Sequence, residues 1–110
     1  MTTYANNFDH TKPFSDTCCQ INLASGVAQS YTVPGVAGTP YRAIFTFIST
    51  ANVYIGLNVT AAAPISGNKT TTANLEFRPI EPKYVKGGDV ISVYCGDAGG
   101  ASVGISLLQL

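Results

Sequence analysis

The amino-acid sequence predicts an all-β fold, an antiparallel β-sandwich or jelly roll with an extended N-terminal arm. Apolar and polar residues alternate in seven or eight short runs, which is the period of half-buried strands. Glycine, proline and asparagine separate these runs, and none of the runs has the helical period of about 3.6 residues. We therefore expect an arm over residues 1–17, a sandwich domain over residues 18–110 and helix content near zero.

The predicted arm is polar but carries three spaced aromatic residues, Tyr4, Phe8 and Phe14. A disordered tail seldom contains so many aromatic side chains. They could dock on a neighbouring molecule or pack back on the parent domain, and the sequence leaves both open. Because the arm lacks an apolar core segment, we expect neither a signal peptide nor a membrane anchor, and hence synthesis in a reducing cytoplasm.

The first strands of the domain are predicted to form a hairpin. Ile21 and Leu23 alternate with polar residues, Ser25-Gly26 supplies a turn, and residues 30–33 alternate again. Such a pair of runs on either side of a short turn is typical of two antiparallel neighbours.

The next two strands are predicted to contribute most of the core. Residues 41–48 are apolar on both faces, with Phe45 and Phe47 on one of them, which is typical of a buried central strand. The following run has alternating apolar residues facing inward and Tyr54 facing outward. The expected core comprises Phe45, Phe47, Ile55, Phe77, Ile91, Val93, Ile105 and Leu107.

The second half of the domain is predicted to contain a long loop and three further strands. Residues 58–73 are small and polar without a period, so we expect a surface loop that serves contact or function. The strand that follows is confined to an edge by nearby prolines. Phe77 is expected on its inward face and Glu76 on its outward face. Two runs, residues 90–95 and 101–110, flank a glycine-rich turn and predict a closing hairpin.

The composition disfavours nucleic acid and membrane partners and favours self-association. Six basic residues balance six acidic ones, and charged residues make up only 11% of the chain. A surface without a basic cluster has no means of releasing counterions from a phosphate backbone. A neutral surface is also poorly protected against association. We therefore expect a homo-oligomer, with a trimer favoured, and no nucleic acid or membrane partner.

The three cysteines allow more than one interpretation. Cys18, Cys19 and Cys95 cannot all pair within one chain, and neighbours in sequence rarely bridge to each other. Buried free thiols are the default, because cysteine packs as a small hydrophobe. A disulfide from Cys18 or Cys19 to Cys95, or to another subunit, is the alternative in an oxidising medium. A zinc site is disfavoured because the lone His10 and the cysteines lack the usual ligand spacing.

Candidate catalytic residues have ordinary structural interpretations. The only histidine lies in the predicted arm, and Asp89 and Asp97 lie in turns, where aspartate favours local backbone hydrogen bonds. The sequence therefore predicts no enzyme, no catalytic residue, no metal and no cofactor. Tyrosines could form a sugar-binding platform, but interface or sheet packing is their default; these are Tyr31, Tyr41, Tyr54, Tyr84 and Tyr94.

Several short motifs resemble small virion proteins of tailed bacteriophages. The segments are Ser25-Gly-Val-Ala-Gln-Ser-Tyr-Thr-Val-Pro34, Ile44-Phe-Thr-Phe47 and Asn52-Val-Tyr-Ile-Gly56. In those proteins a similar turn and Gln-x-Tyr-x-Val-Pro segment precedes a strand, a Val-Tyr-Ile/Val-x-x-Gly strand follows, and a strand pair closes the chain. The resemblance covers residues 24–110 and implies a β-sandwich that decorates a capsid, with no catalytic residues to carry over.

A shorter resemblance concerns the end of the chain. Lys86-Gly-Gly-Asp-Val-Ile-Ser-Val-Tyr94 and Gly100-Ala-Ser-Val-Gly-Ile-Ser-Leu-Leu108 are similar to the last strands of trimeric jelly rolls of the tumour-necrosis-factor and C1q type. Such trimers also form tips of phage fibres. The aromatic residues that those trimers place in the final strands are replaced here by Val103 and Ile105.

The expected function is therefore that of a structural virion protein, made in the host cytoplasm, that decorates and stabilises a bacteriophage capsid. Its expected partners are the major capsid protein or other virion proteins. A tail or fibre-tip module that recognises a host-surface glycan or protein is the alternative. The residues expected at the interface are Tyr4, Phe8, Phe14, Tyr54 and Tyr84.

Overall fold

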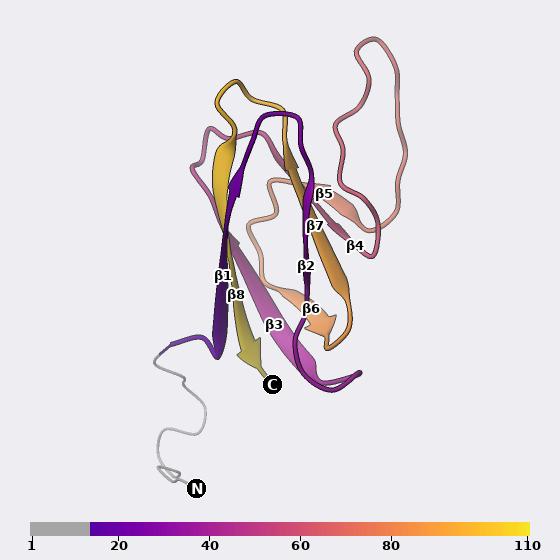
Figure 1. The fold of residues 1–110 in the computed structure, drawn as a ribbon. Coiled ribbons are helices and arrows are strands. Elements are labelled where there is room, and N and C mark those ends of the chain that lie inside the picture. The colour runs from indigo at the N-terminus through magenta and orange to yellow at the C-terminus, as the bar shows by residue number, and fades with distance from the viewer. Residues whose placement is uncertain (1–13) are drawn as a thin grey trace, which may run out of the picture.

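A computed structural model describes residues 14–110 as eight β-strands and, within that range, no helix (Figure 1). The predicted arm residues Tyr4 and Phe8 lie outside the described range. Among residues 14–110, no helix could span a membrane. The strands are β1 (Thr17–Leu23), β2 (Gln29–Thr32), β3 (Pro40–Thr46), β4 (Val53–Leu57), β5 (Leu75–Phe77), β6 (Lys83–Lys86), β7 (Val90–Cys95) and β8 (Ala101–Gln109).

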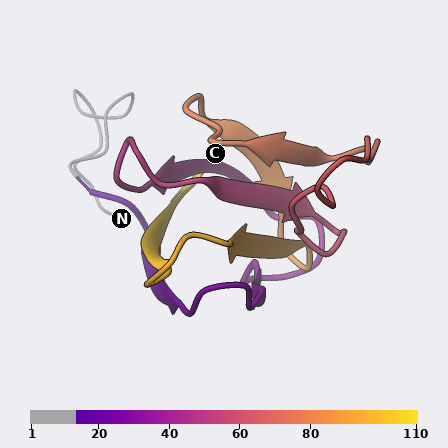
Figure 2. The ribbon, with the colours of Figure 1, turned by 90° about the horizontal axis from the view of Figure 1, so that it is seen from above.

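The strands form two antiparallel sheets of four strands each, an arrangement compatible with a β-sandwich (Figure 2). One sheet, here called sheet A, has the order β1-β8-β3-β6, and the other, sheet B, has the order β2-β7-β4-β5. The pairing runs from the ends of the chain inward: β1 pairs with β8, β2 with β7, β3 with β6 and β4 with β5. The all-β prediction is confirmed.

The core lies between the two sheets and is made by every second residue of their strands. In β8, for example, Ile105 and Leu107 are fully buried, while Ser106 between them is not. This alternation follows from the strand period of two, which sends successive side chains to opposite faces. Five predicted core residues are confirmed as buried: Ile55, Ile91, Val93, Ile105 and Leu107.

Both predicted hairpins are wrong. The strands on either side of Ser25-Gly26, β1 and β2, belong to different sheets, and so do β7 and β8. The turns therefore cross from one sheet to the other instead of joining hydrogen-bonded neighbours, and β4 and β5 are the only consecutive strands that pair among the described residues. Local alternation predicts a strand and its inward face, but the same turn residues serve a hairpin and a crossing.

The β1–β2 and β7–β8 connections, which both cross from one sheet to the other, pack against each other at one end of the molecule. The Gly26 N–H donates to the Cys95 carbonyl at 2.9 Å, and the Ser25 hydroxyl donates to the Gly96 carbonyl at 3.2 Å. Gly100 has a φ of +71°, and a Cβ on it would collide with the Leu23 carbonyl oxygen. A glycine is therefore required where the two crossings touch.

The short strand β5 has the opposite orientation to the predicted one. Phe77 is 49% exposed and Glu76 lies on the inward side, opposite the buried Ile55. Asn74 and Arg78 at its two ends have φ values of 62° and 51°, so the chain enters and leaves β5 through the left-handed region. These two kinks set the face of a three-residue strand, and alternation over so few residues cannot reveal them.

The predicted central strand is shorter than expected. It ends at Thr46 as β3, which lies between β8 and β6, so its central position is confirmed. Phe45 and Phe47 are only partly buried against the core, and Ile48 is 70% exposed because the chain has already turned away from the sheet.

The predicted long loop is confirmed between β4 and β5, and its first residues are anchored on the outer surface of sheet B. Asn58 accepts a hydrogen bond from the Val90 N–H at 2.9 Å, and the buried Ala61 N–H donates to the Ser92 hydroxyl at 2.9 Å. Beyond Ala61 the loop projects away from the sheets (Figure 1).

Candidate interaction surface

Three aromatic side chains form a row across the outer face of sheet B. Tyr54 is opposite Phe77 on one side and Tyr94 on the other in the strand register. The Tyr54 ring centroid is 4.9 Å from that of Phe77 and 6.4 Å from that of Tyr94, and both pairs are tilted. We call Tyr54, Phe77 and Tyr94 the aromatic row. The row lies outside the core, with Phe77 exposed and the two tyrosines half-buried.

Arg78 ends the aromatic row and is held in place by hydrogen bonds. Its guanidinium carbon lies 4.8 Å from the centre of the Phe77 ring, within the range of a cation–π contact. Its Nε donates to the Ala51 carbonyl at 2.8 Å, and one terminal nitrogen donates to the Asn52 side-chain oxygen at 2.7 Å. The guanidinium is thus fixed in orientation beside an exposed ring.

Asp97 completes this network from the β7–β8 connection. Its carboxylate accepts hydrogen bonds from the Asn52 backbone N–H at 2.9 Å and from the Asn52 side-chain amide at 2.8 Å. These bonds, the backbone one first, lower the pKa of Asp97, and the positive charge of Arg78 contributes in the same direction. The predicted local turn role of Asp97 is therefore incomplete, because its side chain binds a residue far away in sequence. Asp89 does have the local role, accepting from the Lys86 N–H at 2.9 Å.

The aromatic row and Arg78 together suit recognition rather than bond-making. Flat aromatic faces and a fixed guanidinium are the groups that protein interfaces favour, and aromatic faces also stack on sugar rings.

Sequence alternation identifies Tyr54 as outward but misplaces Phe77. The asparagine that directly precedes β5 is the sequence signal that could have revealed the inversion, because asparagine tolerates the left-handed region.

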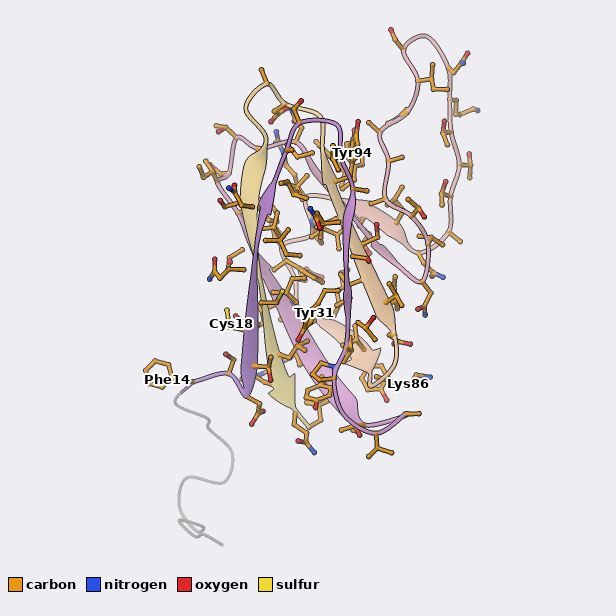
Figure 3. All side chains as sticks on the ribbon, viewed as in Figure 1. Phe14, Cys18, Tyr31, Lys86 and Tyr94 are labelled. Carbon is orange, nitrogen blue, oxygen red and sulfur yellow. The ribbon has the colours of Figure 1, made fainter. Side chains whose placement is uncertain are left out.

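Of the predicted interface residues, Phe14, Tyr54 and Tyr84 belong to the described range, and the structure does not bring these three together. Tyr54 lies on sheet B, whereas Tyr84 is 60% exposed on β6 of sheet A. Phe14 is 84% exposed just before β1 (Figure 3). The five tyrosines do not share one surface, because Tyr41 is buried and Tyr31 packs against the core (Figure 3), which fits sheet packing as their default interpretation.

The three cysteines are free thiols in this structure, and their environments differ. Cys18 is exposed on the outer side of β1 (Figure 3), whereas Cys95 is buried. Cys19 lies between these extremes, and burial raises the pKa of its thiol, with a further contribution from neighbouring Cys18. Cross-linking between subunits remains a prediction. Within residues 14–110 no group of three or more metal-ligating side chains comes together.

Comparisons with protein-family models, with curated proteins and with solved structures find no match to this chain. An interpretation of function therefore depends on the strand topology, the surface and the sequence motifs.

Proposed function

We propose that this chain is a structural virion protein that decorates and stabilises the outer surface of a bacteriophage capsid through symmetric protein–protein contacts, and that its sheets form a jelly roll. Its partners in this proposal are the major capsid protein and further copies of the chain, grouped about a three-fold axis. No catalytic step is assigned to it.

The observation that carries the proposal is the order of strand pairing. A chain whose first strand pairs with its last, and so on inward to β4 and β5, resembles one long antiparallel ribbon wrapped into two sheets. Eight strands in two sheets with this connectivity support a jelly roll, an architecture that recurs in viral capsid and lectin domains. Because a fold alone does not determine function, the surface has to favour one of these uses.

The surface supports assembly. Only 11% of residues are charged and the formal net charge is zero, so copies of the chain repel one another weakly. Large apolar side chains are nevertheless exposed at several places, among them Phe14 at 84%, Val36 at 80% and Ile80 at 85%. Modest contacts of this kind become strong when a closed shell repeats them, because each further contact is effectively intramolecular.

Particles that lack the protein test the proposal. They should assemble, yet release their contents at a lower temperature or on chelation of counterions, and purified protein added back should restore the resistance. Particles that are equally robust without the protein would contradict the proposal.

A tail or fibre-tip binding module is the second candidate, and the aromatic row favours it. Tyr54, Phe77 and the fixed Arg78 offer two tilted aromatic rings beside a cation, which suits a glycan or a protein of the host surface. In that case, particles without the protein would keep their heat resistance and lose adsorption to host cells. Phe77→Ala should reproduce the adsorption defect without unfolding the domain, because the ring lies outside the core.

A further inference from the structure

The sandwich has a cavity of about 180 Å³ at the edge where β5 and β6 lie. Its floor is hydrocarbon from both sheets, and each of these strands ends its own sheet, so the space opens sideways between them. The side chains that form the floor are Phe45, Ile55, Leu57, Val85 and Ile91. An apolar cavity of about 150 Å³ is large enough to hold a benzene ring.

An ion pair spans the mouth of this cavity from one sheet to the other. Lys83 on β6 donates from Nζ to Oε2 of Glu76 on β5 at 2.8 Å, and the two side chains are 35% and 55% exposed. Among the described residues, Oε1 of Glu76 makes no hydrogen bond, and the Lys83 ammonium has further N–H donors. The ion pair therefore offers one acceptor and one donor a few ångströms apart, with no net charge, and the polar residues Asn74 and Tyr84 also line the cavity.

The inversion of β5 produces this arrangement. The left-handed residues at its ends turn Glu76 toward Lys83 and turn Phe77 outward. A charge that points inward on an edge strand also disfavours the addition of a whole strand of another molecule to that edge. What can enter is therefore one side chain rather than an extended β-ribbon.

We propose that this cavity binds a single aromatic or branched aliphatic side chain of a protein partner, with the adjacent backbone amide held by Glu76 and Lys83. The hydrocarbon floor has no polar partner to offer, so the inserted group must be apolar. The mouth matches a neutral amide, whose C=O accepts from Lys83 and whose N–H donates to Glu76. The site follows from the cavity itself and does not depend on a capsid location.

Blocked amino acids test the site directly. N-acetyl-phenylalanine amide and N-acetyl-alanine amide carry the same two amides, but only the first has a ring. In ¹H–¹³C NMR, the phenylalanine compound should shift the methyl signals of Ile55, Leu57, Val85 and Ile91 saturably, and the alanine compound should not. No saturable shift up to the solubility limit of the phenylalanine compound would overturn the proposal.

Variants separate the two parts of the site. Lys83→Met should weaken binding of the phenylalanine compound about threefold to tenfold, the effect of one lost hydrogen bond. Lys86→Met on the same strand is the matched control, because Lys86 ends β6 (Figure 3) and is not among the residues that line the cavity, and it should leave binding unchanged. Val85→Phe should fill the cavity and abolish binding.

The wild-type titration and Lys83→Met keep the test valid if Val85→Phe fails to fold. Benzene that binds while the phenylalanine compound does not would overturn the proposed amide contact, as would equal affinities for wild type and Lys83→Met. A protein that does not bind the phenylalanine compound but still decorates particles would overturn the proposed cavity site and leave the capsid proposal standing. The two proposals therefore fail independently.

Discussion

Replacing Ile105 by alanine should strongly destabilise the protein, because this residue lies at the centre of the core. It is fully buried on β8, with Cys19 of β1 and Phe45 of β3 as its neighbours in the sheet. Strand β8 is central in sheet A, so its inward side chains have a neighbouring strand on each side and belong to the core between the sheets. Pairing with β1 on one side and β3 on the other holds the backbone of β8 in place, which limits its movement into the space that the substitution leaves.

The expected loss follows from the size of the removed group. Ile105→Ala deletes three carbon atoms, and their transfer from the core to water accounts for about 2.4 kcal/mol at about 0.8 kcal/mol for each. The remaining cavity adds about 1.5 kcal/mol if it relaxes only partly. The free energy of unfolding should therefore fall by about 4 kcal/mol. For a domain of this size, that corresponds to a fall in Tm of at least about 15 °C.

Urea unfolding followed by circular dichroism and by tyrosine fluorescence measures this change, since the chain has six tyrosines and no tryptophan. Ile48→Ala is the control, because Ile48 is 70% exposed and its loss should cost under about 0.5 kcal/mol. Ile105→Val should fall between them, at about 1 kcal/mol. A loss below about 1 kcal/mol for Ile105→Ala would refute face-to-face packing of the sheets at this position.

Three further predictions concern the crossing, the acid side of the pH range and the thiols. Gly100→Ala should lower the free energy of unfolding by more than about 2 kcal/mol, whereas Gly99→Ala should lower it by only about 1 kcal/mol, because Gly99 has a similar φ but open space around its Cα. Equal losses for the two variants in urea unfolding would contradict this. The folded pKa of Asp97 lies below its usual value, so its stabilising effect is present above the unfolded pKa and is lost as the pH falls through the folded pKa. Asp97→Asn should therefore flatten the loss of stability below about pH 4, and parallel pH profiles of the two proteins would refute this. A maleimide should modify the exposed Cys18 rapidly and the buried Cys95 only on unfolding. Mass spectrometry of the digested protein measures both rates, and equal rates would contradict the difference in access.

Much of the fold could be predicted from the sequence because side chains alternate over most strands. The inward residues of β4, β7 and β8 follow from that period alone, and Ile55, Val93 and Ile105 are all buried as expected. These strands have at least five residues, which is enough to define a face.

Strand partners and the candidate surface could not be predicted in this way. A turn such as Ser25-Gly26 reverses the chain whether it joins neighbours or crosses to the other sheet, and only the long-range pairing of β1 with β8 distinguishes the two. The orientation of Phe77 depends on two left-handed residues outside the strand, Asn74 and Arg78. The cavity mouth joins Glu76 and Lys83 across two sheets, a proximity that follows only from the complete topology.

The number of copies of this polypeptide in each purified virion tests the central proposal most directly. Quantitative mass spectrometry against an isotope-labelled standard, with the major capsid protein as the internal reference, gives that number. A protein that decorates a symmetric shell should be present in on the order of hundreds of copies, in a simple ratio to the capsid protein. A count of a few tens at most would contradict decoration and favour the fibre tip, and absence from purified particles would contradict a virion role altogether.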